Sequence, residues 1–462
     1  MNHISITNNL TFSERLAKES KSMLLLGAPV IASQLLQMSM GFVDTIMAGH
    51  LNPTALAAVA IGAAIMNPLI VMIIGVLMAA SPIIAQVFGA RKLHKIGKNV
   101  RQALWLSQFL GIPVFFLLRH MEWLMGIMHV DPNLIPVTQG YLDAISWGVP
   151  AIGAYLVLRF FNEAIGATKP GMYFALLGVF FNITGNYVFM YGKLGFPALG
   201  AVGIGLSSAI VGWVMFIGIL IYSATKKSYK RFHIFHNIHL PEWEYMRELL
   251  YVGVPNGIST FLEVSMFALV ALFIGSLGTD AVAGHQIAIN VASITFMIPL
   301  GLSTAITVRV GQAIGRNNIH AARFSGFTGI ALSAGIMACM ALLLFLFPRF
   351  ITNIYTHSTH VQDIAVYLLQ FAAIFQISDG LQVSGIGALR GLKDTRIPMF
   401  VNIIAYWAIG LTTGYYFGLI QHYGPQGFWI GLIAGLTSAA LLHNSRFLYL
   451  THRLLNKDKT VN

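Results

Sequence analysis

The chain has 462 residues, of which 56% are hydrophobic and 10% are charged, and its net charge is +12. An average soluble domain has about 25% charged residues, so a composition with so few charges excludes a large soluble all-α protein. The basic residues lie in short clusters between apolar runs, which is typical of a membrane protein and argues against a nucleic-acid partner.

Apolar runs long enough to cross a bilayer recur along almost the whole chain. A membrane-spanning helix needs roughly 20 mostly apolar residues, and only helices and closed barrels satisfy the backbone in lipid. Barrel strands would be short and alternating, which these runs are not. We therefore predict an all-α polytopic membrane protein whose twelve transmembrane helices lie at 23–49, 55–82, 100–118, 136–164, 171–191, 201–224, 248–275, 281–308, 325–347, 363–389, 398–419 and 427–451.

Lysine and arginine are divided very unequally between alternate loops. With the N-terminus in the cytoplasm, 24 of the 28 basic residues lie on the inner side. Only Arg119, Lys193 and Arg349 lie in outer loops, and Arg159 lies within the fourth span. Because cytoplasmic loops carry the excess of basic residues, we predict that both termini are cytoplasmic. The first 22 residues lack the apolar core of a signal peptide, so we expect the first span to be an uncleaved insertion signal.

The two halves of the sequence align when one is shifted by 226 positions. The offset is kept without a gap over more than sixty residues, and it pairs Gly27 with Gly253, Pro29 with Pro255, Gly49 with Gly275, Gln86 with Gln312 and Gly89 with Gly315. Each copy holds six spans, so both copies have the same orientation, one of the symmetries typical of transporters. We predict an N-lobe at 1–224, a basic cytoplasmic linker at 225–247 that lies at the membrane interface, and a C-lobe at 248–462.

Three acidic residues lie well inside predicted spans: Asp44 in the first, Glu263 in the seventh and Asp379 in the tenth. A charge in the bilayer interior costs several kcal/mol unless it is paired, protonated or hydrated. They could be structural hydrogen-bonding groups between helices. However, we expect no lysine or arginine at a matching depth in any span. Carboxylates without such a partner are predicted to bind protons, metal cations or a cationic substrate.

Other polar residues within the spans have simpler interpretations. Arg159 and Glu163 are four residues apart in the fourth span, so we expect them to form an ion pair along one helix. Asn182 and Asn186 share one face of the fifth span. Alone, they would be expected to join helices by hydrogen bonds. If they face Asp44, they complete an oxygen-rich cation site.

Several segments resemble the multidrug and toxic compound extrusion (MATE) family, and its NorM-type bacterial branch in particular. They are GFVDTIMAG at 41–49, FLEVSMFALV at 261–270, AAIFQISDGLQ at 372–382 and ALRGLKDTRIP at 388–398. The resemblance extends from about residue 20 to 450. It implies two pseudo-symmetric six-helix bundles, the MATE fold, that form a V-shaped cleft open to one side of the membrane at a time.

The resemblance also implies a function and a set of site residues. Members expel organic cations and amphipathic drugs in exchange for Na⁺ or H⁺, so we expect a monomeric multidrug efflux antiporter in the bacterial inner membrane, without a cofactor. Carried over by position, Asp44 with Asn182 and Asn186 forms one cation-coupling site, and Glu263 with Asp379 forms the other. Branch members often have tyrosine where this chain has Phe375, which offers a π face to a cation but no hydroxyl ligand.

Three other functional classes fit the sequence less well than transport of drugs. An integral-membrane acyltransferase or metalloprotease would need a His-x4-Asp or HExxH motif, and neither occurs. A channel would need a filter of repeated carbonyls or a ring of like charges. A flippase of the same superfamily for lipid-linked saccharides would favour a cationic cavity, whereas the predicted buried charges are anionic. The sequence has no GxxxxGK[ST] motif for ATP, so we expect an ion gradient to supply the energy.

Overall fold

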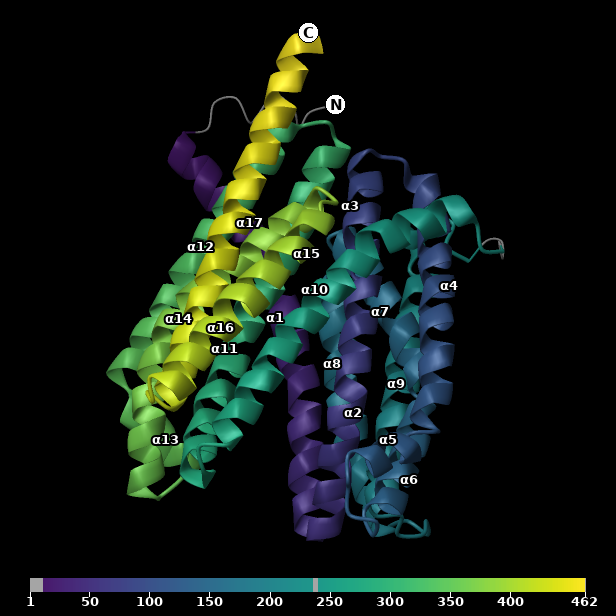
Figure 1. The fold of residues 1–462 in the computed structure, drawn as a ribbon. Helices are drawn as coiled ribbons and strands as arrows, with labels where there is room; N and C mark the ends of the chain where they lie inside the picture. The colour runs from purple at the N-terminus through teal and green to yellow at the C-terminus, as the bar shows by residue number, and fades with distance from the viewer. Residues whose placement is uncertain (1–10, 236–239, 462) are drawn as a thin grey trace. The chain divides into compact units, whose positions relative to one another are not determined.

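The computed structural model describes residues 11–235 and 240–461, and within these ranges every regular element is a helix (Figure 1). Eleven spans are long and apolar enough to cross a membrane. They are α1 (Phe12–Leu51), α2 with α3 (Pro53–Leu77 and Ala80–Gly89), α4 (Leu93–Leu118), α8 (Lys169–Tyr191), α9 (Ala201–Thr225), α10 (Trp243–Gly275), α11 (Thr279–Gly315), α12 (Ile319–Leu346), α14 (Thr359–Gly391), the run from α15 to η3 (Arg396–Ile420) and α17 (Pro425–Val461). The pair α6 (Ile135–Ser146) and α7 (Val149–Ala164) makes a twelfth, so the twelve predicted spans are confirmed.

A proline breaks the helix within the fourth span. The axes of α6 and α7 differ by 43°, and the break falls between Ser146 and Val149. Pro150 is the second residue of α7. A proline has no N–H to donate, and its ring clashes with the carbonyl four residues earlier, here that of Ser146, the last residue of α6. In contrast, Pro29 and Pro255 lie inside the unbroken helices α1 and α10.

The eleventh span is wound differently from the others. It begins as the α-helix α15 (Arg396–Asn402) and widens into the π-helix η2 (Ile403–Leu411). The short α16 (Thr412–Tyr415) and a second π-helical segment, η3 (Tyr416–Ile420), complete it. Hydrophobic periodicity does not distinguish a π-helix from an α-helix over so few turns, so the sequence predicted only a regular span here. Three short helices connect spans: α5 (Glu122–Ile127), η1 (Lys227–Phe232) and α13 (Pro348–Tyr355).

The chain divides into two compact units. We call Ala32–Phe261 the first-half unit; the second-half unit contains Leu262 onward together with the chain up to Ile31. The boundaries of these units fall within α1 and α10, whereas the sequence places the boundary between the lobes in the linker at 225–247. Both helices are longer than a bilayer crossing, with 40 and 33 residues, and each begins in one unit and ends in the other.

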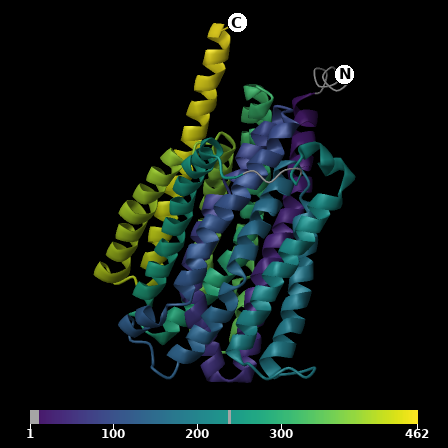
Figure 2. The ribbon, with the colours of Figure 1, turned by 90° about the vertical axis from the view of Figure 1, so that its right-hand side faces the viewer.

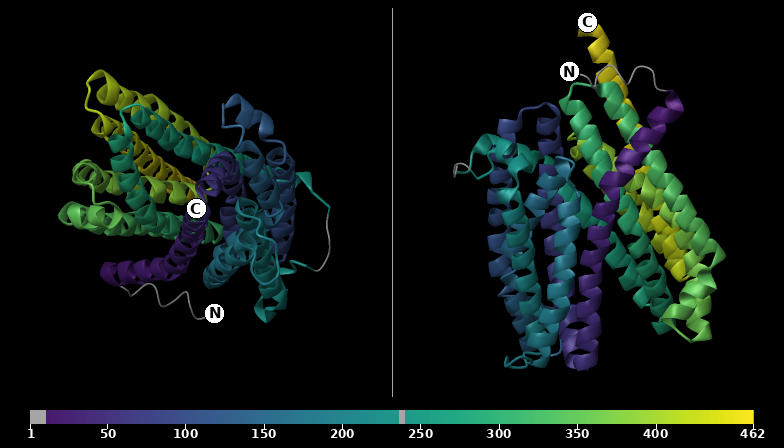
Figure 3. Two further views of the ribbon diagram at one scale, coloured as in Figure 1. Left: turned by 90° about the horizontal axis from the view of Figure 1, so that it is seen from below. Right: turned by 180° about the vertical axis from the view of Figure 1, so that it is seen from behind.

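Each unit is a bundle of helices that lie side by side. In the first-half unit, α9 packs against α6, α7 and α8, and α4 packs against α7 (Figure 2). In the second-half unit, α14 packs against α11, α12 and α17, which Figure 3 shows in green and yellow. This arrangement places both ends of the predicted carboxylate pair, Glu263 and Asp379, in the second-half unit, and Asp44 with its two asparagines in the first-half unit.

The same close helix contact is found once within each unit, at positions related by the offset seen in the sequence. A Cβ atom added at Gly75 would lie 2.6 Å from the Cα of Gly257, and one added at Gly301 would lie 2.9 Å from the backbone nitrogen of Ile31. Positions 75 and 31 shifted by 226 are 301 and 257. Small residues let helix backbones approach closely in membranes, and the same contact is built twice. A second pair of close approaches follows the offset: Gly253 with Val76, and Gly27 with Leu302.

The described part of the predicted linker is folded onto the first-half unit, and residues 236–239 lie outside the described part of the chain. Tyr229 and Phe232 are buried, with exposed fractions of 5% and 0%. The Tyr229 hydroxyl donates to Asn162 Oδ1 at 2.7 Å. Arg101 Nη1 donates to the carbonyls of His233 and Ile234 at 2.6 and 2.8 Å. The aromatic side chains of the linker are therefore core residues of this unit, which the basic composition of the segment did not indicate.

Candidate functional site

The first carboxylate cluster lies in the first-half unit, where two helices bring three predicted residues together. Asp44 is on α1, and Asn182 and Asn186 are one turn apart on α8. The amide nitrogens of both asparagines donate to Asp44 Oδ1, at 2.9 and 2.7 Å. A third donor, the hydroxyl of Ser208 on α9, lies 3.4 Å from Asp44 Oδ2. The predicted trio is a contiguous hydrogen-bonded group, and Ser208 is an addition that a serine in an apolar span did not reveal.

The asparagines of this cluster keep unused acceptor capacity. Their side chains are buried, and the Oδ1 atoms of Asn182 and Asn186 have no hydrogen-bond partner among the described residues. Each amide has an oxygen acceptor opposite its donor nitrogen, so rotating the amide would turn an oxygen toward Asp44. A carboxylate flanked by amide oxygens is the type of ligand set that hard cations prefer. The cluster can therefore hold Asp44 as an anion through its donors or share a cation with it through its acceptors.

The second cluster lies in the second-half unit and contains Glu263 of α10 and Asp379 of α14. Asp379 is buried, with an exposed fraction of 3%, and Glu263 is half-buried. The charges of the two carboxylates interact with each other. Neither forms an ion pair or a hydrogen bond with another described residue, in contrast to Asp44. Like charges in a site of low dielectric repel one another, which favours the binding of a cation or a proton.

A basic residue at the end of α14 bears on this second cluster. The sequence places Arg390 at the cytoplasmic end of its span, and in the structure it lies buried in the last turn of α14. Its positive charge partly offsets the negative charge of Glu263.

Phe375 is part of an aromatic cluster beside Asp379. Its ring is buried and packs edge-on against Phe267 and Trp429, with ring centroids 6.0 and 5.5 Å away. Trp429 in turn donates from Nε1 to Nδ1 of His285 at 3.2 Å. His285 is buried and forms part of this packing. That Phe375 presents its π face to a cation stays a prediction.

The predicted intrahelical ion pair is confirmed. Arg159 Nε lies 2.7 Å from Glu163 Oε1, and both side chains are almost completely buried in the first-half unit. In the described part of the chain, no group of three or more histidine, cysteine, aspartate or glutamate residues is arranged to hold a metal ion. A cation at either cluster would therefore need amide or hydroxyl oxygens in addition to carboxylates.

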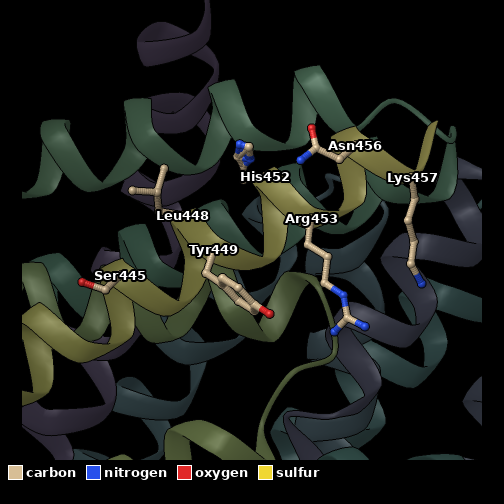
Figure 4. A pocket seen from close by; sticks show the side chains of 7 residues that line it. All are labelled: Ser445, Leu448, Tyr449, His452, Arg453, Asn456 and Lys457. Atoms are coloured by element: carbon tan, nitrogen blue, oxygen red, sulfur yellow. The ribbon is translucent and has the colours of Figure 1, made fainter. Parts of the chain in front are cut away.

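A surface hollow of about 810 Å³ lies beside the C-terminal half of α17 and contains none of the predicted site residues (Figure 4). Figure 4 shows its side chains following one another along the helix. They are Ser445, Leu448, Tyr449, His452, Arg453, Asn456 and Lys457. Two of them, Arg453 and Lys457, belong to the basic residues that the sequence places on the cytoplasmic side. The hollow therefore lies along the basic C-terminal end of α17, and no carboxylate of a described residue lines it.

Comparison with known proteins places both clusters in a recognised family. The MatE family model matches residues 29–188 and 255–416 of the chain. The chain belongs to the MATE family. The two matched segments begin 226 positions apart, at the offset of the internal repeat, so each half carries one copy of the MATE repeat.

Two similar relatives are both named multidrug resistance protein MdtK. The one from Photorhabdus laumondii is 42% identical over 435 residues, which cover 93% of this chain and 95% of the relative. The one from Proteus mirabilis is 40% identical over 438 residues, which cover 94% of this chain and 96% of the relative. The chain therefore corresponds to these MATE proteins over nearly their full length.

Solved MATE structures share the fold at low sequence identity. An outward-facing multidrug resistance MATE family transporter superimposes with a TM-score of 0.86 at 21% identity, covering 94% of this chain and 96% of that chain. A transporter from Pyrococcus furiosus, described by the reverse polarity of its binding pocket and a suggested different function, gives a TM-score of 0.84 at 20% identity, covering 94% and 96%. These likenesses establish the fold.

Proposed function

We propose that this protein is a multidrug efflux antiporter that exports organic cations and amphipathic drugs in exchange for Na⁺ or H⁺ by alternating access of its two lobes. Its relatives named multidrug resistance protein MdtK support the transported class, because they match over nearly the whole chain. Transport leaves the substrate chemically unchanged, so the proposal includes no enzymatic step. The protein is proposed to work as a monomer in the bacterial inner membrane with both termini in the cytoplasm.

The observation that carries the proposal is the state of the carboxylates within the spans. Asp44 is held by amide and hydroxyl donors and by no basic side chain among the described residues. The charges of Glu263 and Asp379 bear on one another, and the charge of Arg390 bears on Glu263. A membrane protein gains no stability from uncompensated anions within its spans, so such anions indicate a functional cation. Cationic substrates and cationic coupling ions both suit these clusters.

The proposed coupling uses the difference between two states of each cluster. Binding of Na⁺ or H⁺ neutralises a carboxylate and favours one arrangement of the transporter, while release on the other side favours the alternative arrangement. An ion can shift this equilibrium only if it binds the two arrangements with different affinities. The unused acceptor oxygens of Asn182 and Asn186 supply one source of such a difference, because their amides can present either nitrogen or oxygen to Asp44.

The proposal is tested with the purified protein in proteoliposomes. Efflux of a lipophilic organic cation such as tetraphenylphosphonium is followed under an imposed Na⁺ gradient alone and then under a H⁺ gradient alone. We expect at least one gradient to drive accumulation against the concentration gradient of the probe, and we expect a fluorescent sulfonate not to be moved. Transport of the sulfonate alone, or no gradient-driven transport of the cation, would refute the proposed function.

A further inference from the structure

A stripe of buried polar side chains runs along α14 on both sides of Asp379. Gln376 and Gln382 lie three residues before and three residues after it, so the three side chains share one face of the helix. Their exposed fractions are 1%, 3% and 0% for Gln376, Asp379 and Gln382. An apolar stripe would be sufficient for packing in a helical bundle, and buried polar groups are costly unless they have partners. The stripe therefore needs a functional or structural explanation.

Gln382 connects this stripe to the π-helical span. Its Nε2 atom donates to the hydroxyl of Tyr406 at 2.5 Å, and Tyr406 is fully buried on η2. The Tyr406 hydroxyl interacts electrostatically with both Glu263 and Asp379. Since its oxygen is an acceptor for Gln382, its hydrogen and second lone pair remain available. Because Gln382 lies one helical turn from Asp379 on α14, this bond places the Tyr406 hydroxyl on the polar stripe, whereas Phe375 has no hydroxyl.

The amide oxygens of the stripe also lack partners. Gln376 Nε2 is fixed by donating to Thr295 Oγ1 at 2.8 Å. The Oε1 atoms of Gln376 and Gln382 are buried, and neither has a hydrogen-bond partner in residues 11–235 and 240–461. Most buried side-chain acceptors in proteins are satisfied, so orphaned ones are places where water or an ion is expected. Carboxylate, amide and hydroxyl oxygens together are ligands for a hard cation.

We propose that Tyr406, positioned by Gln382, supplies the hydroxyl that contacts the coupling cation at the Glu263–Asp379 cluster. The assignment rests on the proposed function, since it extends the coupling site in the second-half unit. A Na⁺ ion would be bound by the hydroxyl oxygen. If the coupling ion is a proton, the protonated carboxyl of Asp379 or Glu263 would donate a hydrogen bond to the same oxygen. The ionised carboxylate would instead accept a hydrogen bond from the hydroxyl. The widened turns of η2 belong to this assignment, because π-helical turns in α-helical segments are frequent at functional sites.

Two charged groups, from two elements, bear on this hydroxyl. They are Glu263 on α10 and Asp379 on α14. The cation dependence of transport is therefore the property that loss of the hydroxyl should change.

The test compares Tyr406→Phe with Tyr415→Phe in proteoliposomes. Both variants remove one hydroxyl from the same span, but Tyr415 is 45% exposed and lies outside the cluster. Efflux of tetraphenylphosphonium is measured as a function of external Na⁺ and, separately, of external H⁺. For the ion that drives efflux, Tyr406→Phe should raise the concentration for half-maximal rate by about tenfold, with the maximal rate retained, since a hydrogen bond to a charged group is worth roughly that factor. Tyr415→Phe should behave like the wild type.

A second variant tests the positioning role of Gln382. Gln382→Met removes the bond to Tyr406 at nearly constant volume, so it should shift the cation dependence in the same direction. The double variant with Tyr406→Phe should be no worse than Tyr406→Phe alone, because both changes remove one interaction. If the effects of Gln382→Met and Tyr406→Phe on the cation dependence add in the double variant, the positioning role is wrong.

Asp379→Asn separates failure of this inference from failure of the proposed function. If Asp379→Asn abolishes gradient-driven efflux while Tyr406→Phe keeps the wild-type cation dependence, the assignment of Tyr406 is wrong and the proposed function stands. If Tyr406→Phe lowers only the maximal rate or the thermal midpoint in detergent, Tyr406 is a structural residue and the assignment is also wrong. If Asp379→Asn transports normally, the proposed coupling by this cluster fails.

Discussion

At the scale of single residues, the two clusters stabilise their carboxylates in different ways. Asp44 accepts hydrogen bonds from two amides and a hydroxyl, so neutral donors stabilise its charge. The charges of Glu263 and Asp379 bear on one another, and the charge of Arg390 bears on Glu263. Neutral donors leave a carboxylate free to exchange ions, whereas a guanidinium competes with a bound cation. The first cluster is therefore the simpler one in which to test coupling.

Replacing Asp44 by asparagine should abolish transport without unfolding the protein. Asp44→Asn keeps the volume and can keep bonds to Asn182 and Asn186 through its own amide oxygen, but it removes the charge that binds the ion. We expect normal membrane insertion, an unchanged thermal midpoint in detergent and efflux at the level of empty vesicles. The matched control is Asp363→Asn, which neutralises an exposed carboxylate paired with exposed Arg349. Normal efflux by Asp44→Asn at equal expression would contradict coupling at this residue.

The buried Arg159–Glu163 pair should be important for stability rather than transport. Removing one member of a buried pair leaves an uncompensated charge and typically costs about 3–5 kcal/mol. We expect Arg159→Met to lower the thermal midpoint strongly, measured by tryptophan fluorescence in detergent. The double variant Arg159→Met/Glu163→Met should recover most of the loss, because no charge remains buried. Arg349→Met, which breaks an exposed pair, serves as the control and should leave the midpoint unchanged.

At the scale of elements, the linker helix η1 is bound to the first-half unit through a close backbone approach. A Cβ atom at Gly97 would lie 2.3 Å from the carbonyl oxygen of Phe232. The ring of Phe232 packs edge-on against Phe161 and the ring of Tyr229 does the same, at 5.8 and 5.5 Å. Burial raises the pKa of the Tyr229 hydroxyl, which therefore stays a neutral donor to Asn162 at physiological pH. The linker is a folded element, although its sequence resembles a basic interfacial connector.

Gly97→Ala should therefore detach or distort this linker. The added methyl group meets backbone atoms, which cannot move aside as a flexible side chain could. We expect a lower thermal midpoint and faster proteolysis within 225–247 in detergent. The control is Gly335→Ala, since a Cβ at Gly335 on α12 meets nothing within 4 Å and alanine is the better helix former. Equal stability of the two variants would contradict the docked position of η1.

At the scale of the whole molecule, the charge asymmetry of the loops predicts the orientation in the membrane. Lys227 is exposed at the start of η1, and Lys193 is exposed in a predicted outer loop. In a Cys339→Ala background, Lys193→Cys should react rapidly with an impermeant thiol reagent added outside intact cells, and Lys227→Cys should react only after permeabilisation. The opposite labelling pattern would reverse the predicted topology, because successive loops lie on alternate sides of the membrane.

The fold of the whole molecule and the chemistry of its sites bear on function in different ways. The MATE fold is shared with a Pyrococcus furiosus transporter that is described by a binding pocket of reverse polarity. A fold therefore does not determine which substrate is moved, and the site has to be argued from its own groups. Here the predicted cation-coupling residues all carry acidic or neutral oxygen ligands, apart from Phe375, and this is why we propose cationic substrates.

The sequence alone determined the features that depend on local composition or on the order of residues. Spans are set by the length of apolar runs, so all twelve are recovered within a few residues at most ends. The repeat follows from a constant offset, and the MATE match and the paired glycine contacts confirm it. The trio of Asp44, Asn182 and Asn186 was predicted because the two asparagines share a helix face and the family resemblance places them opposite the aspartate.

The tertiary structure decided the features that depend on which side chains reach one another across helices. Arg390 is buried in the last turn of α14 and its charge bears on Glu263 of α10, which its place at the end of a predicted span did not indicate. Tyr406 of η2 is bonded to Gln382 of α14, a contact across helices that hydrophobic periodicity does not reveal. The ends of α1 and α10 pack with the opposite unit because these helices extend beyond one bundle, and apolar runs do not specify which bundle a helix end contacts.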